Sequence, residues 1–182
     1  MIIVLFADGF EEIEALLPVD ILRRGGLDVI TVGICGKTVV GSHGIQLICD
    51  AEAGEINPDE VTMAIFPGGM PGATNLDSSE FTDRIISAVM NNGGRLAAIC
   101  AAPLIFGRRG LLEGKTATCY PGFEQELRGA TIAKESVVTD GCITTAKGMG
   151  VALEFAEELL SLCVGKEKTA EISGAIYRPE RA

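Results

Sequence analysis

Residues 97–103 read Ala-Ala-Ile-Cys-Ala-Ala-Pro, with small residues on both sides of Cys100. A short apolar run at 96–99 leads into Cys100, and apolar residues with helical spacing follow at 104–106. A reactive side chain on a tight turn between a strand and a helix needs small residues two positions before it and two positions after it. Ala98 and Ala102 meet that need. The stretch therefore predicts a strand, a nucleophile elbow at Cys100 and a helix.

The position of Cys100 at this turn predicts that it is a reactive cysteine. A thiol at the amino end of a helix lies near the positive end of the helix dipole and near free backbone N–H groups, and both lower the pKa of a thiol. We therefore predict that Cys100 is ionised at neutral pH. The alternative is a small buried cysteine at the end of a strand. That interpretation holds for the other five cysteines, which have no comparable setting: Cys35, Cys49, Cys119, Cys142 and Cys163.

Outward from the elbow, strand and helix patterns alternate along the chain. Short apolar runs predict strands at 2–6, 29–34, 45–48, 63–66, 96–99, 115–119, 137–139 and 143–145. Helical spacing predicts helices from position 8 or 9 to about 25, and at 81–90, 104–106, 148–164 and 167–173. This alternation is typical of a mostly parallel α/β sheet with helices on both faces. The chain has 182 residues with no linker and no internal repeat, so we expect a single domain over 1–182.

Three loops that follow predicted strands hold unusual residues. They are the segment 8–14, the glycine pair Gly68 and Gly69, and the elbow at Cys100. In open parallel sheets the loops at the carboxyl ends of the strands converge, so we expect the three to be neighbours. Gly68 and Gly69 allow a backbone N–H to approach a reacting oxygen and, with the N–H of Ala101, to form an oxyanion hole. The alternative is a turn that needs only the positive φ that glycine permits.

Composition excludes several classes of protein. The formal net charge is −10 and no run of Lys and Arg is present, so we expect no nucleic-acid partner bound through a basic patch. No stretch approaches the roughly 20 apolar residues of a membrane-spanning helix. The apolar segment 2–6 has the pattern of a first strand and not of a signal peptide. We therefore expect a cytoplasmic protein without a membrane partner.

Motifs for metals and cofactors fail on inspection. The six cysteines are scattered without a C-x-x-C motif, so we expect no disulfide framework. A single histidine excludes a metal site built from several His ligands, and no motif supports the remaining alternative of carboxylate or thiolate ligands, so we expect no metal. Two glycine segments bear on nucleotide binding. The segment 113–116 lacks the first glycine of a phosphate loop, because position 109 is Arg, and 148–150 lacks the third glycine of a dinucleotide motif, because position 153 is Leu. We expect no cofactor.

Three separated motifs carry a resemblance to a known family. They are Phe-Glu-Glu-Ile-Glu at 10–14 with Pro-Val-Asp-Ile-Leu-Arg-Arg-Gly-Gly at 18–26, Phe-Pro-Gly-Gly at 66–69, and Ala-Ile-Cys-Ala-Ala-Pro at 98–103. In this order, over essentially the whole chain, they resemble the ThiJ/PfpI superfamily, and within it the branch of the Parkinson's-disease-associated protein deglycase and its bacterial relatives. The resemblance implies a flavodoxin-like three-layer sandwich like that of class I glutamine amidotransferases, a homodimer, and an elbow cysteine with a strained backbone.

The same resemblance assigns roles to single residues. It implies that Glu14 is a protonated carboxyl group that donates a hydrogen bond to the thiolate of Cys100. It also implies that Gly69 and Ala101 supply the N–H groups of an oxyanion hole. Glu11 and Glu12 do not match the position of that carboxyl group, and we interpret them as solvated carboxylates in the first turn of a helix.

The chain departs from the family pattern where a histidine is expected. Family members with protease-like activity carry a histidine directly after the elbow or nearby, and the human-type branch has one just before a proline where this chain has Tyr120. Without a Cys-His pair, peptide hydrolysis lacks a proton donor for its leaving group, so a PfpI-type cysteine peptidase is disfavoured. Tyr120 is interpreted as a replacement hydrogen-bond donor or as a packing residue. The only histidine, His43, is either an exposed loop residue or a partner subunit's contribution to the rim of the site.

These residues suit chemistry on a small, reactive carbonyl compound. We predict that Cys100 attacks an α-oxoaldehyde such as methylglyoxal, that Glu14 moves protons between the adjacent carbons, and that hydrolysis releases lactate. On protein or nucleotide adducts of such aldehydes the same chemistry is deglycation. An alternative function uses the same residues but does not convert a substrate. An accessible cysteine of low pKa beside a proton donor also suits an oxidation sensor in a stress-response or chaperone protein.

Overall fold

The computed structural model of the chain describes residues 1–177, so the last five positions of the predicted 1–182 unit lie outside the described residues. Within residues 1–177, no helix is both long enough and apolar enough to span a membrane. The elements in chain order are β1 (Ile2–Phe6), α1 (Glu12–Arg24), β2 (Val29–Gly33), β3 (Thr38–Val40), β4 (Gln46–Ile48), β5 (Ala51–Glu52), β6 (Met63–Phe66), α2 (Gly72–Asp77), α3 (Glu80–Asn91), β7 (Arg95–Ile99), α4 (Pro103–Arg108), β8 (Thr116–Ala117), β9 (Thr131–Ile132), β10 (Val137–Asp140), β11 (Ile143–Ala146), α5 (Ala152–Val164) and α6 (Lys166–Ala175).

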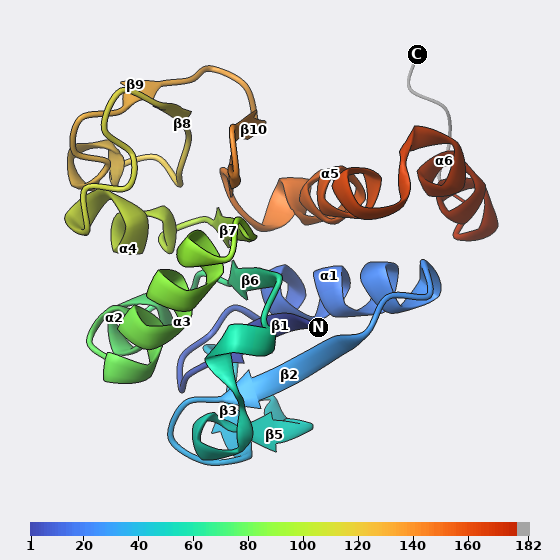
Figure 1. The fold of residues 1–182 in the computed structure, drawn as a ribbon, viewed down its shortest axis with the longest axis horizontal. Coiled ribbons are helices and arrows are strands. Elements are labelled where there is room, and N and C mark those ends of the chain that lie inside the picture. The colour runs from blue at the N-terminus through green and yellow to red at the C-terminus, as the bar shows by residue number, and fades with distance from the viewer. Residues whose placement is uncertain (178–182) are drawn as a thin grey trace.

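Seven of these strands form one sheet in the order β10-β11-β7-β6-β1-β2-β5. All neighbours run parallel except β10, which is antiparallel to β11. The central strands β1 and β6 are buried at every position, as expected for strands covered on both faces. Helices α2, α3 and α4 pack on one face and α1, α5 and α6 on the other, and a hydrophobic cluster fills each interface (Figure 1). The predicted flavodoxin-like α/β fold is confirmed.

Helix α1 begins later than the sequence predicts. The expected start at position 8 or 9 is wrong, because the helix begins at Glu12. Glu11 caps it, since a carboxylate oxygen of Glu11 accepts the N–H of Glu14 at 2.7 Å. The residues before the cap form a turn in which Gly9 has a φ of +86°. The N–H of Glu11 donates to the carbonyl of Gly68 at 2.9 Å, which joins this turn to the loop after β6.

Further segments differ from the expectation, and the short strands β3, β5 and β9 are absent from the predicted set. The run 115–119 forms only the two-residue strand β8, which pairs with β9 outside the main sheet. Helix α2 was not predicted, because its six residues are too few to show a helical repeat of apolar positions. The helix predicted over 148–164 begins at Ala152, and a single 3₁₀ turn, Met149–Val151, precedes it. That turn contributes to the site described next.

Candidate active site

Cys100 lies on a tight turn between β7 and α4. Its φ is +64°, a left-handed conformation that non-glycine residues rarely adopt and that costs about 1–3 kcal/mol. Two backbone hydrogen bonds hold the turn: the N–H of Cys100 donates to the carbonyl of Ala146 at 2.9 Å, and the N–H of Tyr120 donates to the carbonyl of Cys100 at 2.8 Å. Ala98 and Ala102 are fully buried beside the turn. The backbone strain that the family resemblance implies is present.

Glu14 reaches the sulfur of Cys100 from the first turn of α1. Glu14 is only 1% exposed, and its carboxyl group shares a hydrogen bond with the side chain of Cys100. The N–H of Gly68 donates to Oε2 of Glu14 at 3.1 Å. The N–H of Met149 also donates to this carboxyl group. These donors, from two different loops, fix the orientation of the carboxyl group toward the sulfur.

The glycines after β6 permit this close approach. A Cβ at Gly68 would lie 2.5 Å from the Cβ of Cys100 and 2.5 Å from Oε2 of Glu14, so a larger residue would displace one of the two. Gly69 has a φ of +88°. The N–H groups of Gly69 and Ala101 both donate to the sulfur of Cys100, whereas the N–H of Gly68 is directed at Glu14. Of the three predicted donors, the structure brings Gly69 and Ala101 to the sulfur of Cys100.

A pocket of about 500 Å³ opens over Cys100 and Glu14. Tyr120 is half exposed and forms part of the wall, so the structure brings it to the site. The loop from Lys147 to Val151, between β11 and α5, forms another part of the wall, and the sequence analysis missed it. Its glycines were considered only as a nucleotide motif. The signal that could have identified the loop is its place directly after β11, the strand beside β7 in the sheet.

Burial acts on both members of the Cys100–Glu14 pair. Burial raises the pKa of the Glu14 carboxyl group from its ordinary 4.5 to about 7, with a smaller contribution from the charge of Glu11. Burial, followed by the charge of an ionised Glu14, raises the pKa of the Cys100 thiol to about 12, although the N–H groups of Gly69 and Ala101 oppose this shift. The prediction of a lowered thiol pKa from the helix end is therefore wrong in sign. The local donors do not outweigh desolvation and a neighbouring carboxylate.

The two raised pKa values describe a pair that holds two protons below about pH 7 and shares one proton above it. The shared proton has two possible positions, and both give the pair a net charge of −1. In the first form Cys100 is a thiol and Glu14 a carboxylate, and in the second form Cys100 is a thiolate and Glu14 a carboxylic acid. In the second form Glu14 no longer repels the sulfur and instead donates a hydrogen bond to it. A thiolate at Cys100 is therefore compatible with this site only while Glu14 keeps its proton.

The raised pKa of Glu14 predicts a specific pH dependence of stability. The folded state holds this proton more tightly than the unfolded chain, so the contribution is complete below pH 4.5 and is lost as pH rises through about 7, a loss of about 3 kcal/mol. A glutamine at this position cannot ionise. We expect the free energy of unfolding of Glu14→Gln, relative to wild type, to improve by about 3 kcal/mol between pH 4.5 and pH 8 in urea titrations. A difference that stays constant over this range would contradict the assigned pKa.

His43 lies in the turn between β3 and β4, and it is not among the residues that line this pocket. Its side chain is 71% exposed, its Nδ1 lies 2.8 Å from Oε2 of Glu12, and its N–H donates to Oε1 of Glu12 at 2.8 Å. Burial acts to raise the pKa of Glu12, but the hydrogen bonds and charge of His43 hold it at about 2. The interpretation of Glu12 as a solvated carboxylate is wrong, because Glu12 is buried and bonded to this turn.

Glu11, Glu12 and His43 are also the residues whose spacing suits a metal. One donor atom from each lies within 4.8 Å of the other two. Glu11 already caps α1, and both oxygens of Glu12 already accept hydrogen bonds from His43. These bonds account for the cluster, and we assign it no metal.

Known proteins resemble the chain in both sequence and structure. The family model described as "DJ-1/PfpI family" matches residues 1–162. The chain belongs to the DJ-1/PfpI family. The resemblance drawn from the three sequence motifs is thereby confirmed.

Individual DJ-1/PfpI proteins align over nearly all of this chain. Protein DJ-1 homolog B of Arabidopsis thaliana is 40% identical over 177 residues, which are 95% of this chain but only 40% of that protein. The crystal structure of Drosophila melanogaster DJ-1beta matches with a TM-score of 0.92 and 31% identity, and the match covers 98% of this chain and 97% of that one. A Caenorhabditis elegans member of the family, named glutathione-independent glyoxalase DJR-1.2, is 29% identical over 170 residues, 92% of this chain and 90% of that protein.

Proposed function

We propose that this protein is a cofactor-independent glyoxalase, and a deglycase when the aldehyde is attached to a protein or a nucleotide. The observation that carries the proposal is the contact between the sulfur of Cys100 and the buried carboxyl group of Glu14 in an open pocket. A nucleophile, a group that exchanges protons near neutral pH and N–H donors for a developing charge are what this reaction requires. The name of the C. elegans relative supports the same reaction class.

The reaction begins when the thiolate of Cys100 adds to the aldehyde carbon of methylglyoxal. A C–S bond forms, the carbonyl π bond breaks, and the new alkoxide takes a proton from Glu14 to give a hemithioacetal. The N–H groups of Gly69 and Ala101 lie beside the sulfur, so they stabilise the negative charge before and during its transfer to oxygen.

Glu14, now a carboxylate, completes the conversion by carrying two protons in succession. It moves the proton on the carbon bonded to sulfur to the ketone oxygen, which gives an enediol, and it then moves the hydroxyl proton of the first carbon to the second carbon. The first carbon is thereby oxidised to a thioester, and the second is reduced to an alcohol. Water hydrolyses the thioester, which releases lactate and restores Cys100, so the net change is methylglyoxal plus water to lactate. A carboxyl group with a pKa near 7 suits both transfers, because it gains and loses a proton at little cost at neutral pH.

The direct test is to incubate the purified protein with methylglyoxal and to measure lactate. We expect lactate to form in proportion to the protein concentration and to equal the methylglyoxal consumed, without glutathione or any added cofactor. Consumption of methylglyoxal without lactate would contradict the proposal, because it would indicate only adduct formation on lysine, arginine and cysteine side chains.

Oxidation sensing is the second candidate function, and the partial exposure of Cys100 favours it. An accessible thiolate can be oxidised by peroxide to a sulfenic or sulfinic acid, and a neutral Glu14 carboxyl group would donate a hydrogen bond to the added oxygen. The two functions give different results in one experiment. A peroxide-dependent mass gain on Cys100 in a protein that forms no lactate supports the sensor, whereas lactate formation that oxidation abolishes supports the enzyme.

We also propose a homodimer formed through α1 and the β3–β4 hairpin. These elements expose large apolar side chains: Ile13, Val40, Ile45 and Ile48. Ile48 is 75% exposed, and a second copy covering it would remove this surface from water. The hairpin also carries His43, so this dimer would place His43 near the partner subunit.

The dimer proposal predicts a loss of assembly when a charge is placed on this face. We expect Ile48→Lys to raise the dissociation constant of the dimer at least about tenfold, because a buried lysine lacks a partner there. Light scattering after size-exclusion chromatography measures the change in mass. Ile132→Lys is the matched control, since Ile132 is an exposed isoleucine on β9, away from the hairpin. A wild-type protein that is monomeric at micromolar concentration would refute the proposal.

A further inference from the structure

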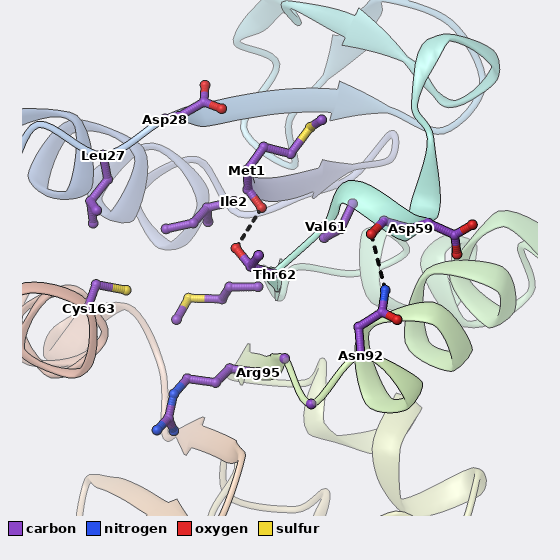
Figure 2. A pocket seen from close by; sticks show the side chains of 13 residues that line it. Met1, Ile2, Leu27, Asp28, Asp59, Val61, Thr62, Asn92, Arg95 and Cys163 are labelled. Atoms are coloured by element: carbon purple, nitrogen blue, oxygen red, sulfur yellow. Dashed lines mark hydrogen bonds between the residues drawn. The ribbon is translucent and has the colours of Figure 1, made fainter.

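A second pocket lies at the amino ends of the parallel strands, the opposite end of the sheet from Cys100. Its volume is about 620 Å³, larger than that of the pocket at Cys100 and within the range of small-molecule sites. The lining includes Ile2 at the start of β1, Met63 at the start of β6 and Arg95 at the start of β7. Cys163, in the last turn of α5, completes one side (Figure 2). The reaction proposed above uses none of these residues.

Two uncharged polar side chains on the rim of this pocket are already engaged with the backbone. The hydroxyl group of Thr62 donates to the carbonyl of Met1 at 3.0 Å. The side-chain amide of Asn92 donates to the carbonyl of Asp59 at 3.1 Å. Figure 2 shows both bonds along the wall. A molecule that enters the pocket therefore meets a largely hydrocarbon surface.

Arg95 is the charged side chain that this surface leaves without a carboxylate partner. Its guanidinium group donates to the carbonyl of Gly141 at 3.2 Å, and none of the ion pairs within residues 1–177 includes it. Figure 2 shows Arg95 along the lower edge of the pocket, on the side where Cys163 lies, and Asp28 and Asp59 at the upper and right edges, with their carboxylates pointing away from the centre. In a chain with a net charge of −10, a cation beside an apolar wall favours an anionic ligand.

Cys163 adds a neutral group to this side of the pocket. Partial desolvation of the sulfur raises the pKa of the Cys163 thiol, although the charge of Arg95 opposes the shift. The thiol therefore stays protonated at neutral pH and does not repel an anion. A protonated thiol also reacts slowly with a bound ligand, because the thiolate is the reactive form.

We propose that this pocket binds a small amphipathic monocarboxylate, with its carboxylate group on Arg95 and its hydrocarbon part against Ile2 and Met63. A single negative charge is favoured over two, because Asp28 and Asp59 at the rim repel a second one. The site is separate from Cys100, so the proposal stands independently of the glyoxalase reaction.

Octanoate, used below its micellar concentration, is the probe for this site. In protein labelled with ¹³C in the methionine methyl groups, we expect octanoate to shift the resonance of Met63 and not that of Met149, which lines the pocket at Cys100. Arg95→Gln should weaken octanoate binding about tenfold, because it removes a charged hydrogen-bond donor. Arg128→Gln removes the same charge elsewhere and should leave the affinity unchanged.

Cysteine alkylation provides a second measurement on the unmodified sequence. Octanoate should slow the reaction of Cys163 with iodoacetamide in proportion to occupancy, and it should not affect Cys35, which is also exposed. Octan-1-ol, which lacks the carboxylate, should bind the wild type as weakly as octanoate binds Arg95→Gln. The proposal is overturned if Met63 does not shift, if Met149 shifts in its place, or if Arg95→Gln binds octanoate as tightly as the wild type does.

Discussion

Cys100→Ser is expected to abolish lactate formation from methylglyoxal, with a loss of at least about a thousandfold in kcat/KM. Serine is close to cysteine in size, so the elbow and its left-handed backbone, φ +64°, are retained. A hydroxyl group does not ionise near neutral pH, and Glu14 is too weak a base to activate it. The variant therefore lacks the nucleophile that forms the hemithioacetal. Lactate assays on wild type and variant, with thermal unfolding as a check on folding, measure the effect.

Cys35→Ser is the matched control for this substitution. Cys35 is an exposed free cysteine that lines a different cavity from the one at Cys100. We expect this variant to form lactate at the wild-type rate. If Cys100→Ser retained activity within about tenfold of the wild type, Cys100 would not be the nucleophile.

Glu14→Gln is expected to lower lactate formation about 10²- to 10⁴-fold, the usual contribution of a positioned acid-base group. Glutamine has nearly the same shape, and its oxygen can still accept the N–H of Gly68, which lies 3.1 Å from Oε2 of Glu14. An amide cannot carry a proton from one carbon to the next, so the reaction should stop at the hemithioacetal. Mass spectrometry should then show a methylglyoxal adduct on Cys100 without release of lactate.

Glu11→Gln is the matched control for Glu14→Gln, because it removes the same negative charge from the pocket without removing the proposed proton carrier. Glu11 lines the same pocket and also caps α1, and a glutamine oxygen can keep the capping bond. We expect lactate formation within about tenfold of the wild type, because Glu11 does not contact the sulfur in this account. Equal losses in Glu11→Gln and Glu14→Gln would instead attribute both effects to the lost negative charge.

The fold and the position of the nucleophile could be predicted because the patterns that specify them are local. Runs such as Ile2–Phe6 and Met63–Phe66 are apolar at every position, and only strands covered on both faces bury such runs completely. The elbow was visible because a turn this tight admits only small neighbours, here Ala98 and Ala102. The convergence of the loops then followed from the geometry of a parallel sheet.

The rest of the site depends on contacts between distant segments, which local patterns do not reveal. Glu12 is buried because His43, 31 positions away, hydrogen-bonds to it. Met149 donates to Glu14 from a loop that no motif marked as part of the site. The ionisation of Cys100 could not be predicted for the same reason, because the largest effect on its pKa is burial by segments distant in the sequence and not the N–H donors at the end of the helix.

We infer that Cys100 and Glu14 share one proton above about pH 7, and that the sulfur is anionic and reactive when the carboxyl group holds it. The most direct test is the rate of Cys100 alkylation by iodoacetamide as a function of pH, with each cysteine quantified separately by mass spectrometry. We expect an inflection at about pH 7, where the pair loses its first proton, followed by a plateau. A rate that rises instead through about pH 8.5, as for an ordinary free thiol, would contradict it.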